Sequence, residues 1–104
     1  MGLRVIKNAQ AIRDLIEAAD YIAQDNFDAA EGLIDAVESA VELLAENPKV
    51  GSNQTLVNPR LTEIQMWPVR GFENYQIFYQ ATDTTLNIIR ILHRGRNIAA
   101  LFED

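Results

Sequence analysis

Residues 90 to 96 bring the only histidine of the chain together with three arginines, in a protein whose formal net charge is −6. An imidazole can accept or donate a proton near neutral pH, and guanidinium groups bind phosphate oxygens through paired hydrogen bonds. Tyr79 could add a weak acid, and Arg70 a further positive charge. Such a set suits cleavage of RNA by its own 2′-hydroxyl, which requires a base, an acid and cations that stabilise the phosphorane. The candidate catalytic residues are therefore His93, Tyr79 and Arg90.

The same residues also have simpler structural interpretations. His93 could end a strand, hydrogen-bonded to backbone, and so fix the segment that follows. Arg90 alternates with Ile88 and Leu92, so its stem should lie on apolar surface while its head group pairs with a carboxylate of this chain or of a partner. We expect Arg94 to be exposed and to contact a partner. The residues expected to bind a target or partner are Arg70, Arg90, His93, Arg94, Arg96 and Phe102.

The composition excludes several classes of site. With 104 residues, no cysteine and one histidine, the chain has no recognised set of metal ligands. It also lacks a phosphate-binding glycine loop, a dinucleotide fingerprint and a Ser-His-acid pattern, so we expect neither a metal nor a cofactor. The length suits one domain over residues 1–104. We find no signal peptide or membrane-spanning stretch, and the lack of cysteine fits a cytoplasmic protein.

The charge is unevenly distributed along the chain. Residues 1 to 47 carry ten acidic and three basic side chains, or −7, whereas residues 48 to 104 carry five acidic and six basic ones, or +1. The acidic side chains of the first segment are expected to form solvated helix faces. A chain this acidic is poorly suited to binding ribosomal RNA, and we expect no sequence-specific DNA binding by this chain alone.

Hydrophobic periodicity predicts two helices in the first half. After an apolar run at residues 3 to 7, which reads as an edge strand, Asn8 can cap a helix that ends near Gln24. Asp25 or Asn26 can cap a second helix, and Pro48 ends it because proline lacks a backbone donor. The predicted apolar stripes are Ile12, Leu15, Ile16, Ala19 and Ile22 in the first helix and Ala30, Leu33, Ile34, Val37, Val41 and Leu44 in the second, with Arg13, Asp14, Glu17, Asp20 and Gln24 on the opposite side of the first.

The second half is typical of strands. Residues 49 to 60 have no clear period and form the longest expected loop, and strands are predicted at residues 61 to 69, 75 to 81 and 86 to 93. Pro68 should mark an end or a bulge, and the aromatic residues of these strands are expected to pack in the core or an interface. A helix or helical turn is predicted at residues 95 to 103. The order β-α-α-β-β-β-α predicts an α+β fold, an antiparallel sheet with the helical hairpin on one face and its other face open.

Three segments together carry a family resemblance. They are DLIEAADYIAQDNFDAAEGLIDAVESAVELLAENPKVG at residues 14 to 51, MWPVRGFENYQIFYQA at residues 66 to 81 and LNIIRILHRGRNIAALF at residues 86 to 102. The chain resembles toxins of the ParE/RelE superfamily from bacterial type II toxin–antitoxin systems, most closely the ParE-like branch. The specific features are an acidic helical hairpin ending in Asn-Pro, a strand pair with Trp-Pro-Val and Ile-Phe-Tyr, and a closing strand with Leu-His.

The resemblance implies a cytoplasmic toxin that a cognate antitoxin binds and inactivates as a hetero-oligomer. ParE-like members inhibit DNA gyrase and so block replication, whereas RelE-like members cleave messenger RNA in the ribosome. The two share a fold and not a mechanism, so the fold does not choose between them. We expect the first, a non-enzymatic growth inhibitor of the plasmid-stabilization type. The ribosome-dependent endoribonuclease is the alternative.

Two departures from the family pattern suggest a third possibility. Many relatives carry arginine at the positions of Gln65 and Gln80. The loss of two positive charges on adjacent strands would weaken contacts to phosphate. The chain could therefore also be an inactive relative that only binds antitoxin, or a retargeted toxin.

Overall fold

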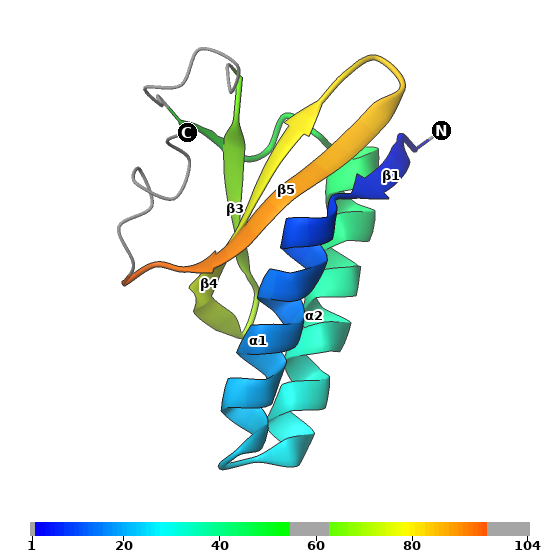
Figure 1. The fold of residues 1–104 in the computed structure, drawn as a ribbon. Helices are drawn as coiled ribbons and strands as arrows, with labels where there is room; N and C mark the ends of the chain where they lie inside the picture. Colours follow the sequence, from blue (N-terminus) through cyan, green and yellow to red (C-terminus); the bar gives the residue numbers. More distant parts are fainter. Residues whose placement is uncertain (1, 55–62, 96–104) are drawn as a thin grey trace.

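The computed structural model describes residues 2–54 and 63–95, which form two helices and five strands. In chain order these are β1 (Arg4–Lys7), α1 (Ala9–Ala23), α2 (Phe27–Glu46), β2 (Ser52–Asn53), β3 (Gln65–Val69), β4 (Phe72–Ala81) and β5 (Thr85–His93). The two helices form an antiparallel hairpin along one face of the sheet (Figure 1). The predicted α+β fold with a helical hairpin is thereby confirmed. Within these residues, neither helix has the length and apolar character needed to span a bilayer.

The sheet has the strand order β1-β5-β4-β3-β2. β3, β4 and β5 form an antiparallel meander, and β2 pairs antiparallel with β3 inside the segment expected to be a loop. β1, however, pairs parallel with β5, so the sheet is mixed and the expectation of a purely antiparallel sheet is wrong at this edge. Alternation of apolar residues identifies a strand but not the direction of its neighbour, and the sequence could not decide this point.

The helix ends follow the capping residues of the sequence. Asn8 caps α1, since its Oδ1 accepts the backbone N–H of Ala11 at 2.8 Å. Of the two candidates for the second cap, Asn26 is the one used, with its Oδ1 3.0 Å from the N of Ala29. α2 stops at Glu46, immediately before Asn47 and the proline that follows. The predicted starts and ends of both helices are confirmed.

The apolar stripe predicted for α2 is largely correct, whereas that of α1 is only partly correct. Ala30, Leu33, Val37, Val41 and Leu44 are buried as expected. On α1, Ala19 is buried and Leu15 and Ile22 pack against the core as predicted. Ile12 and Ile16, however, are 46% and 55% exposed, and the helix also buries Ala11, Asp14 and Ala18. The helix is rotated so that an aspartate faces the sheet. A hydrophobic pattern alone does not predict this, because it assigns every carboxylate to solvent.

The face of the sheet opposite the helices carries a second apolar cluster. Ile64, Phe78 and Leu92 are no more than 1% exposed, and Met66 and Ile89 pack against them. The expectation that this face is open is therefore wrong at its centre. Register shifts lie between Pro68 and Val69 and between Phe78 and Tyr79, so the predicted irregularity at Pro68 is confirmed.

Candidate functional site at the junction of α1 and β5

A buried carboxylate occupies the place where α1 crosses the edge of β5. β1 covers that edge only as far as Ile88, whose carbonyl oxygen accepts the N–H of Asn8 at 3.1 Å. Beyond this point the backbone N–H of Ile91 donates to Asp14 Oδ2 at 3.1 Å. The carboxylate thus accepts a backbone N–H at the edge of β5 that a longer β1 would otherwise have paired.

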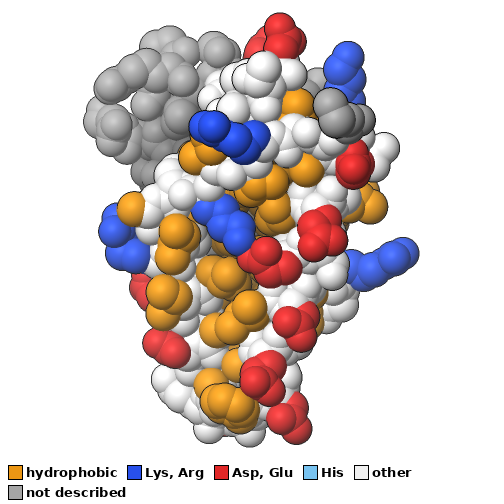
Figure 2. All heavy atoms as spheres, turned by 90° about the vertical axis from the view of Figure 1, so that its right-hand side faces the viewer, with side chains coloured by type: hydrophobic (Ala, Val, Ile, Leu, Met, Phe, Trp, Pro, Cys, Tyr) orange, Lys and Arg blue, Asp and Glu red, His pale blue; other side chains and the backbone are white. Residues whose placement is uncertain are grey.

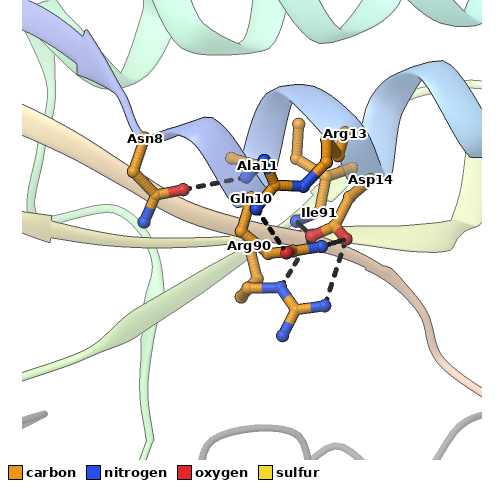
Figure 3. A network of polar contacts seen from close by, with 7 residues as sticks. All are labelled: Asn8, Gln10, Ala11, Arg13, Asp14, Arg90 and Ile91. Atoms are coloured by element: carbon orange, nitrogen blue, oxygen red, sulfur yellow. Dashed lines mark hydrogen bonds and ion pairs between the residues drawn. The ribbon is translucent and has the colours of Figure 1, made fainter.

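Asp14 is the centre of a polar network, shown in Figure 3. Arg90 donates to both of its oxygens, from Nε at 2.7 Å and from Nη2 at 3.1 Å. Gln10 Nε2 adds a further bond at 3.0 Å. Burial would raise the pKa of Asp14, but the hydrogen bonds from Arg90, Gln10 and Ile91 outweigh it and hold the pKa below its usual value. The sequence-based expectation that Arg90 pairs with a carboxylate is confirmed, and its partner is in this chain.

Beside this network lies an open pocket of about 390 Å³. Its walls come from α1, from β5 and from the start of β4, and its lining residues are Asp14, Glu17, Ala18, Tyr21, Tyr75, Ile91 and His93. The Tyr75 and His93 rings meet edge to face, with centroids 5.2 Å apart. Burial, and then the proximity of Tyr21, raises the pKa of Tyr75. At ordinary pH the Tyr75 hydroxyl is therefore a neutral hydrogen-bonding group.

His93 is exposed at the end of β5. Its Nδ1 accepts the backbone N–H of Gly95 at 3.1 Å, so in the neutral ring the proton is on Nε2. In this tautomer Nε2 carries a proton and is able to donate a hydrogen bond, while the lone pair of Nδ1 is engaged by Gly95. The histidine fixes the turn after β5, as one interpretation of the sequence predicted.

Tyr79 does not lie with His93. Its side chain is fully buried, its hydroxyl donates to the carbonyl oxygen of Pro48 at 2.8 Å, and it accepts the N–H of Gly51 at 3.0 Å. Burial also raises its pKa. Gly51 is required at this contact, because a Cβ there would collide with the Tyr79 hydroxyl and lie 2.9 Å from the carbonyl oxygen of Met66. Tyr79 therefore anchors the segment after α2, and the suggested pairing with His93 as catalytic acid is not supported.

The remaining predicted arginines mark one end of the sheet. Arg70 and Arg94 are exposed, Arg70 in the turn between β3 and β4 and Arg94 directly after β5. The N–H of Arg94 donates to the carbonyl oxygen of Asn74 at 2.7 Å, which ties the end of β5 to the start of β4. A hydrogen bond from Gly71 and, to a smaller extent, the charge of Arg70 lower the pKa of Glu73. Arg96 and Phe102 lie outside the described residues.

The two glutamines at which the resemblance leads us to expect arginine are on neighbouring strands. Gln65 is at the start of β3, and its Nε2 donates to the carbonyl oxygen of Gly51 at 3.2 Å. Gln80 is on β4 opposite Asn87. In the part of the chain that the structure describes, no three His, Cys, Asp or Glu side chains are grouped so that they could hold a metal ion.

Sequence reasoning missed the α1 side of this site. Asp14, Glu17, Ala18 and Tyr21 all line the pocket, although the first two were assigned to a solvated face. Their spacing of three, one and three residues places them on one helix face, which is the signal that could have identified them. Nothing in the sequence links them to Tyr75 and His93, which are more than fifty residues away.

Comparison with known proteins places these features in context. The family model described as the ParE toxin of the type II toxin–antitoxin system, parDE, matches residues 5–98. The fold is similar to a chain of the chromosomal ParDE toxin–antitoxin system from P. aeruginosa, with a TM-score of 0.71, 13% identity and coverage of 88% of this chain and 95% of that one. It is also similar to a chain of the E. coli DinJ-YafQ toxin–antitoxin complex, with a TM-score of 0.61, 17% identity and coverage of 99% and 100%. A search of curated proteins finds no match.

Proposed function

This chain belongs to the ParE toxin family of type II toxin–antitoxin systems, and on that premise we propose that it inhibits DNA gyrase and thereby replication until a cognate antitoxin neutralises it. The family match over residues 5–98 is the observation that carries the proposal. The family and the toxin role that were predicted from the sequence agree with this family match. We place the action in the cytoplasm, where gyrase acts on DNA.

An antitoxin partner is supported by the two similar structures, both of which come from toxin–antitoxin systems. The described part of the chain also offers surfaces for such a partner. One is the basic end of the sheet with Arg70 and Arg94, and another is the outer side of the helical hairpin. An antitoxin that folds on binding could cover both, because a disordered segment can wrap a large surface.

Inhibition by binding is favoured over RNA cleavage by the placement of the candidate catalytic groups. Tyr79 is enclosed and holds the Pro48–Gly51 segment, Arg90 is bonded to Asp14, and the Nδ1 lone pair of His93 is engaged by Gly95. Acid–base catalysis requires an acid and a base within hydrogen-bond reach of one reacting centre. A net charge of −6 also opposes binding to ribosomal RNA.

Two other functions keep specific support. The similarity to a chain of the DinJ-YafQ complex, together with the exposed His93 and Arg94, fits a ribosome-dependent endoribonuclease. Gln65 and Gln80 fit an inactive relative that only binds antitoxin. Each of these alternatives predicts a different result in cells and with purified gyrase.

A supercoiling assay with purified gyrase, run beside primer extension on messages from cells that express the chain, separates the three functions. We expect loss of supercoiling without new message ends, and relief of growth arrest when the antitoxin is co-expressed. Cleaved messages with unaffected gyrase would establish the endoribonuclease instead. Normal growth after induction of the chain alone would leave only the antitoxin-binding relative.

A further inference from the structure

The pocket between α1 and the sheet, which we call the aromatic pocket, is formed by regular elements. On the sheet, His93 lies two residues after Ile91 and opposite Tyr75 of β4, so all three side chains lie on one side. The other lining residues share one face of α1, because their spacing is i, i+3, i+4 and i+7: Asp14, Glu17, Ala18 and Tyr21. Helices and strands position side chains more precisely than loops do, so the walls of the pocket are preformed.

Glu17 supplies the unpaired charge of the aromatic pocket. Asp14, the other carboxylate, already accepts hydrogen bonds at both oxygens and is paired with Arg90. Glu17 is exposed, and among the residues that the structure describes none forms a hydrogen bond or an ion pair with its side chain. A ligand in this pocket therefore meets one negative charge that the described part of the chain leaves without a partner.

Aromatic rings lie around this charge. Tyr21 is 70% exposed, and Tyr75 meets the imidazole of His93 edge to face. Burial, and to a smaller extent the nearby Tyr21, raises the pKa of Tyr75 and keeps its ring neutral. The face of a tyrosine ring attracts cations. α1 also ends at Ala23 without a basic residue in its last turn, so the negative end of the helix dipole favours a positively charged ligand as well.

The chemistry of the pocket selects among cations. A metal ion needs several ligands, and the described residues contain no group of three His, Cys, Asp or Glu side chains that could hold one. A lysine ammonium is compact and strongly hydrated, whereas a guanidinium is planar, stacks on aromatic rings and pairs with a carboxylate through two hydrogen bonds. The most buried lining residues, Ala18 and Ile91, are apolar and suit the aliphatic stem of an arginine. An arginine side chain therefore fits this pocket best.

The surroundings of Glu17 distinguish it from the other carboxylates of the helices. Figure 2 shows acidic side chains spread over the surface of the helical hairpin, where they raise the general attraction for any cation. Glu31 on α2 is exposed like Glu17 but does not line the aromatic pocket. Glu17 combines its charge with aromatic walls, and Glu31 provides a control of equal charge without them.

We propose that the aromatic pocket binds an arginine side chain of the target protein. The inference rests on the proposed function and deepens it, since it names a chemical group that the target must present. The pocket adjoins the basic end of the sheet, because Arg94 directly follows His93. A target surface with an arginine beside a carboxylate would satisfy Glu17 and Arg94 together, and such opposite charges fix the orientation of binding.

Two blocked tripeptides that differ in charge test the pocket itself. One has arginine at its centre, and the other has citrulline, which has nearly the same shape but no charge. His93 is the only histidine of the chain, so its imidazole signals report binding to the intact protein in an NMR titration. The arginine peptide should bind about fivefold more tightly at low salt, as expected for one partly exposed ion pair. Equal binding of the two peptides would overturn the proposal.

Matched variants locate the bound peptide. Glu17→Gln should abolish the preference for arginine over citrulline, whereas Glu31→Gln, the same change at an exposed position of α2, should retain it. Tyr21→Ala should weaken binding of the arginine peptide by about threefold, while Tyr21→Phe leaves it unchanged, because the ring rather than the hydroxyl attracts the cation. An unchanged preference in Glu17→Gln would show that the peptide binds elsewhere.

Inhibition of purified gyrase tests whether the arginine belongs to the target. Glu17→Gln should raise the concentration needed to block supercoiling by about fivefold, and Glu31→Gln should not. If Glu17→Gln instead weakened only neutralisation by the antitoxin, the arginine would come from the antitoxin and the proposal would be wrong. Full inhibition by Glu17→Gln would reject the pocket and leave the proposed function intact, whereas an unmodified chain that never inhibits gyrase would reject the proposed function itself.

Discussion

The carboxylate of Asp14 accepts the backbone N–H of Ile91 at 3.1 Å, a contact between residues 77 positions apart in the sequence. It joins α1 to the part of β5 that β1 does not reach. The same carboxylate binds Arg90, so one buried charge satisfies a strand edge and neutralises a guanidinium. This contact explains why the rotation of α1 buries an aspartate and exposes Ile12 and Ile16.

Asp14→Asn is expected to destabilise the fold by about 3 kcal/mol, because it leaves the largely buried Arg90 without its counter-charge. The Arg90 side chain is only 15% exposed, so water can replace the carboxylate only in part. Asp20→Asn, an exposed change on the same helix, should shift stability by no more than about 0.5 kcal/mol. Urea denaturation of the two variants measures the difference, and coincident midpoints would show that the buried pair contributes nothing.

The stabilisation by Asp14 should disappear in acid. Its pKa in the folded chain lies below the usual value of 3.8, so its contribution is complete above that pH and is lost as the pH falls through the folded-state value. The stability difference between the unmodified chain and Asp14→Asn should therefore be constant from neutral pH down to about pH 5 and shrink below about pH 4. A difference that persists unchanged at about pH 2 would mean that the pKa of Asp14 does not contribute to stability as described.

Local signals predicted most of the architecture. Asn8, Asn26 and Pro48 set the helix limits because capping and the missing proline donor act over a few residues. β1, β3, β4 and β5 followed from β-branched and aromatic runs, whereas β2 lies in a segment that was expected to be a loop. The hairpin between β4 and β5 followed from the short TDTT segment. Such features depend on neighbours in the chain, which the sequence displays directly.

The features that were missed depend on residues far apart in the sequence. The parallel pairing of β1 with β5, the burial of Asp14 against Ile91 and the closed cluster of Ile64, Phe78 and Leu92 all arise between distant segments. For the candidate site, sequence reasoning named Arg90, His93 and Arg94 because their charges stand out in an acidic chain, and their functional roles stay predictions. It grouped Tyr79 with them by chemistry alone, and burial separates that residue from the others.

Tyr79→Phe is expected to cost about 1–2 kcal/mol of stability, since it leaves the N–H of Gly51 and the carbonyl of Pro48 without their partner. Growth arrest per folded molecule should remain unchanged, because the hydroxyl is enclosed. Tyr21→Phe is the control, as Tyr21 is 70% exposed and its substitution should not affect stability. A folded Tyr79→Phe protein without toxicity would restore Tyr79 as a catalytic acid.

Reversal of charge at the basic end of the sheet should weaken the attack on the target. Arg70→Glu and Arg94→Glu change exposed side chains, so the fold should persist while the concentration needed to inhibit gyrase rises by about tenfold for each. Arg13→Glu, an exposed substitution on α1 whose guanidinium donates to Gln10 at 2.9 Å, is the control with the same charge change. If Arg13→Glu weakens the inhibition of gyrase as much as Arg70→Glu and Arg94→Glu do, net charge rather than this end of the sheet determines the effect.

His93→Ala distinguishes binding from catalysis. Removal of a general acid or base typically lowers a rate by about 10²–10⁴-fold. In the structure the ring supports the turn at Gly95 and packs against Tyr75, so its loss should loosen the end of β5 and reduce toxicity by less than about tenfold. His93→Asn, whose side-chain oxygen can still accept the N–H of Gly95 but cannot transfer protons, should recover most of the activity. Growth curves at matched expression measure both variants. If Asn and Ala at this position were equally inactive while antitoxin binding remained normal, proton transfer by His93 would be required, and the endoribonuclease would replace the gyrase inhibitor as the function of this chain.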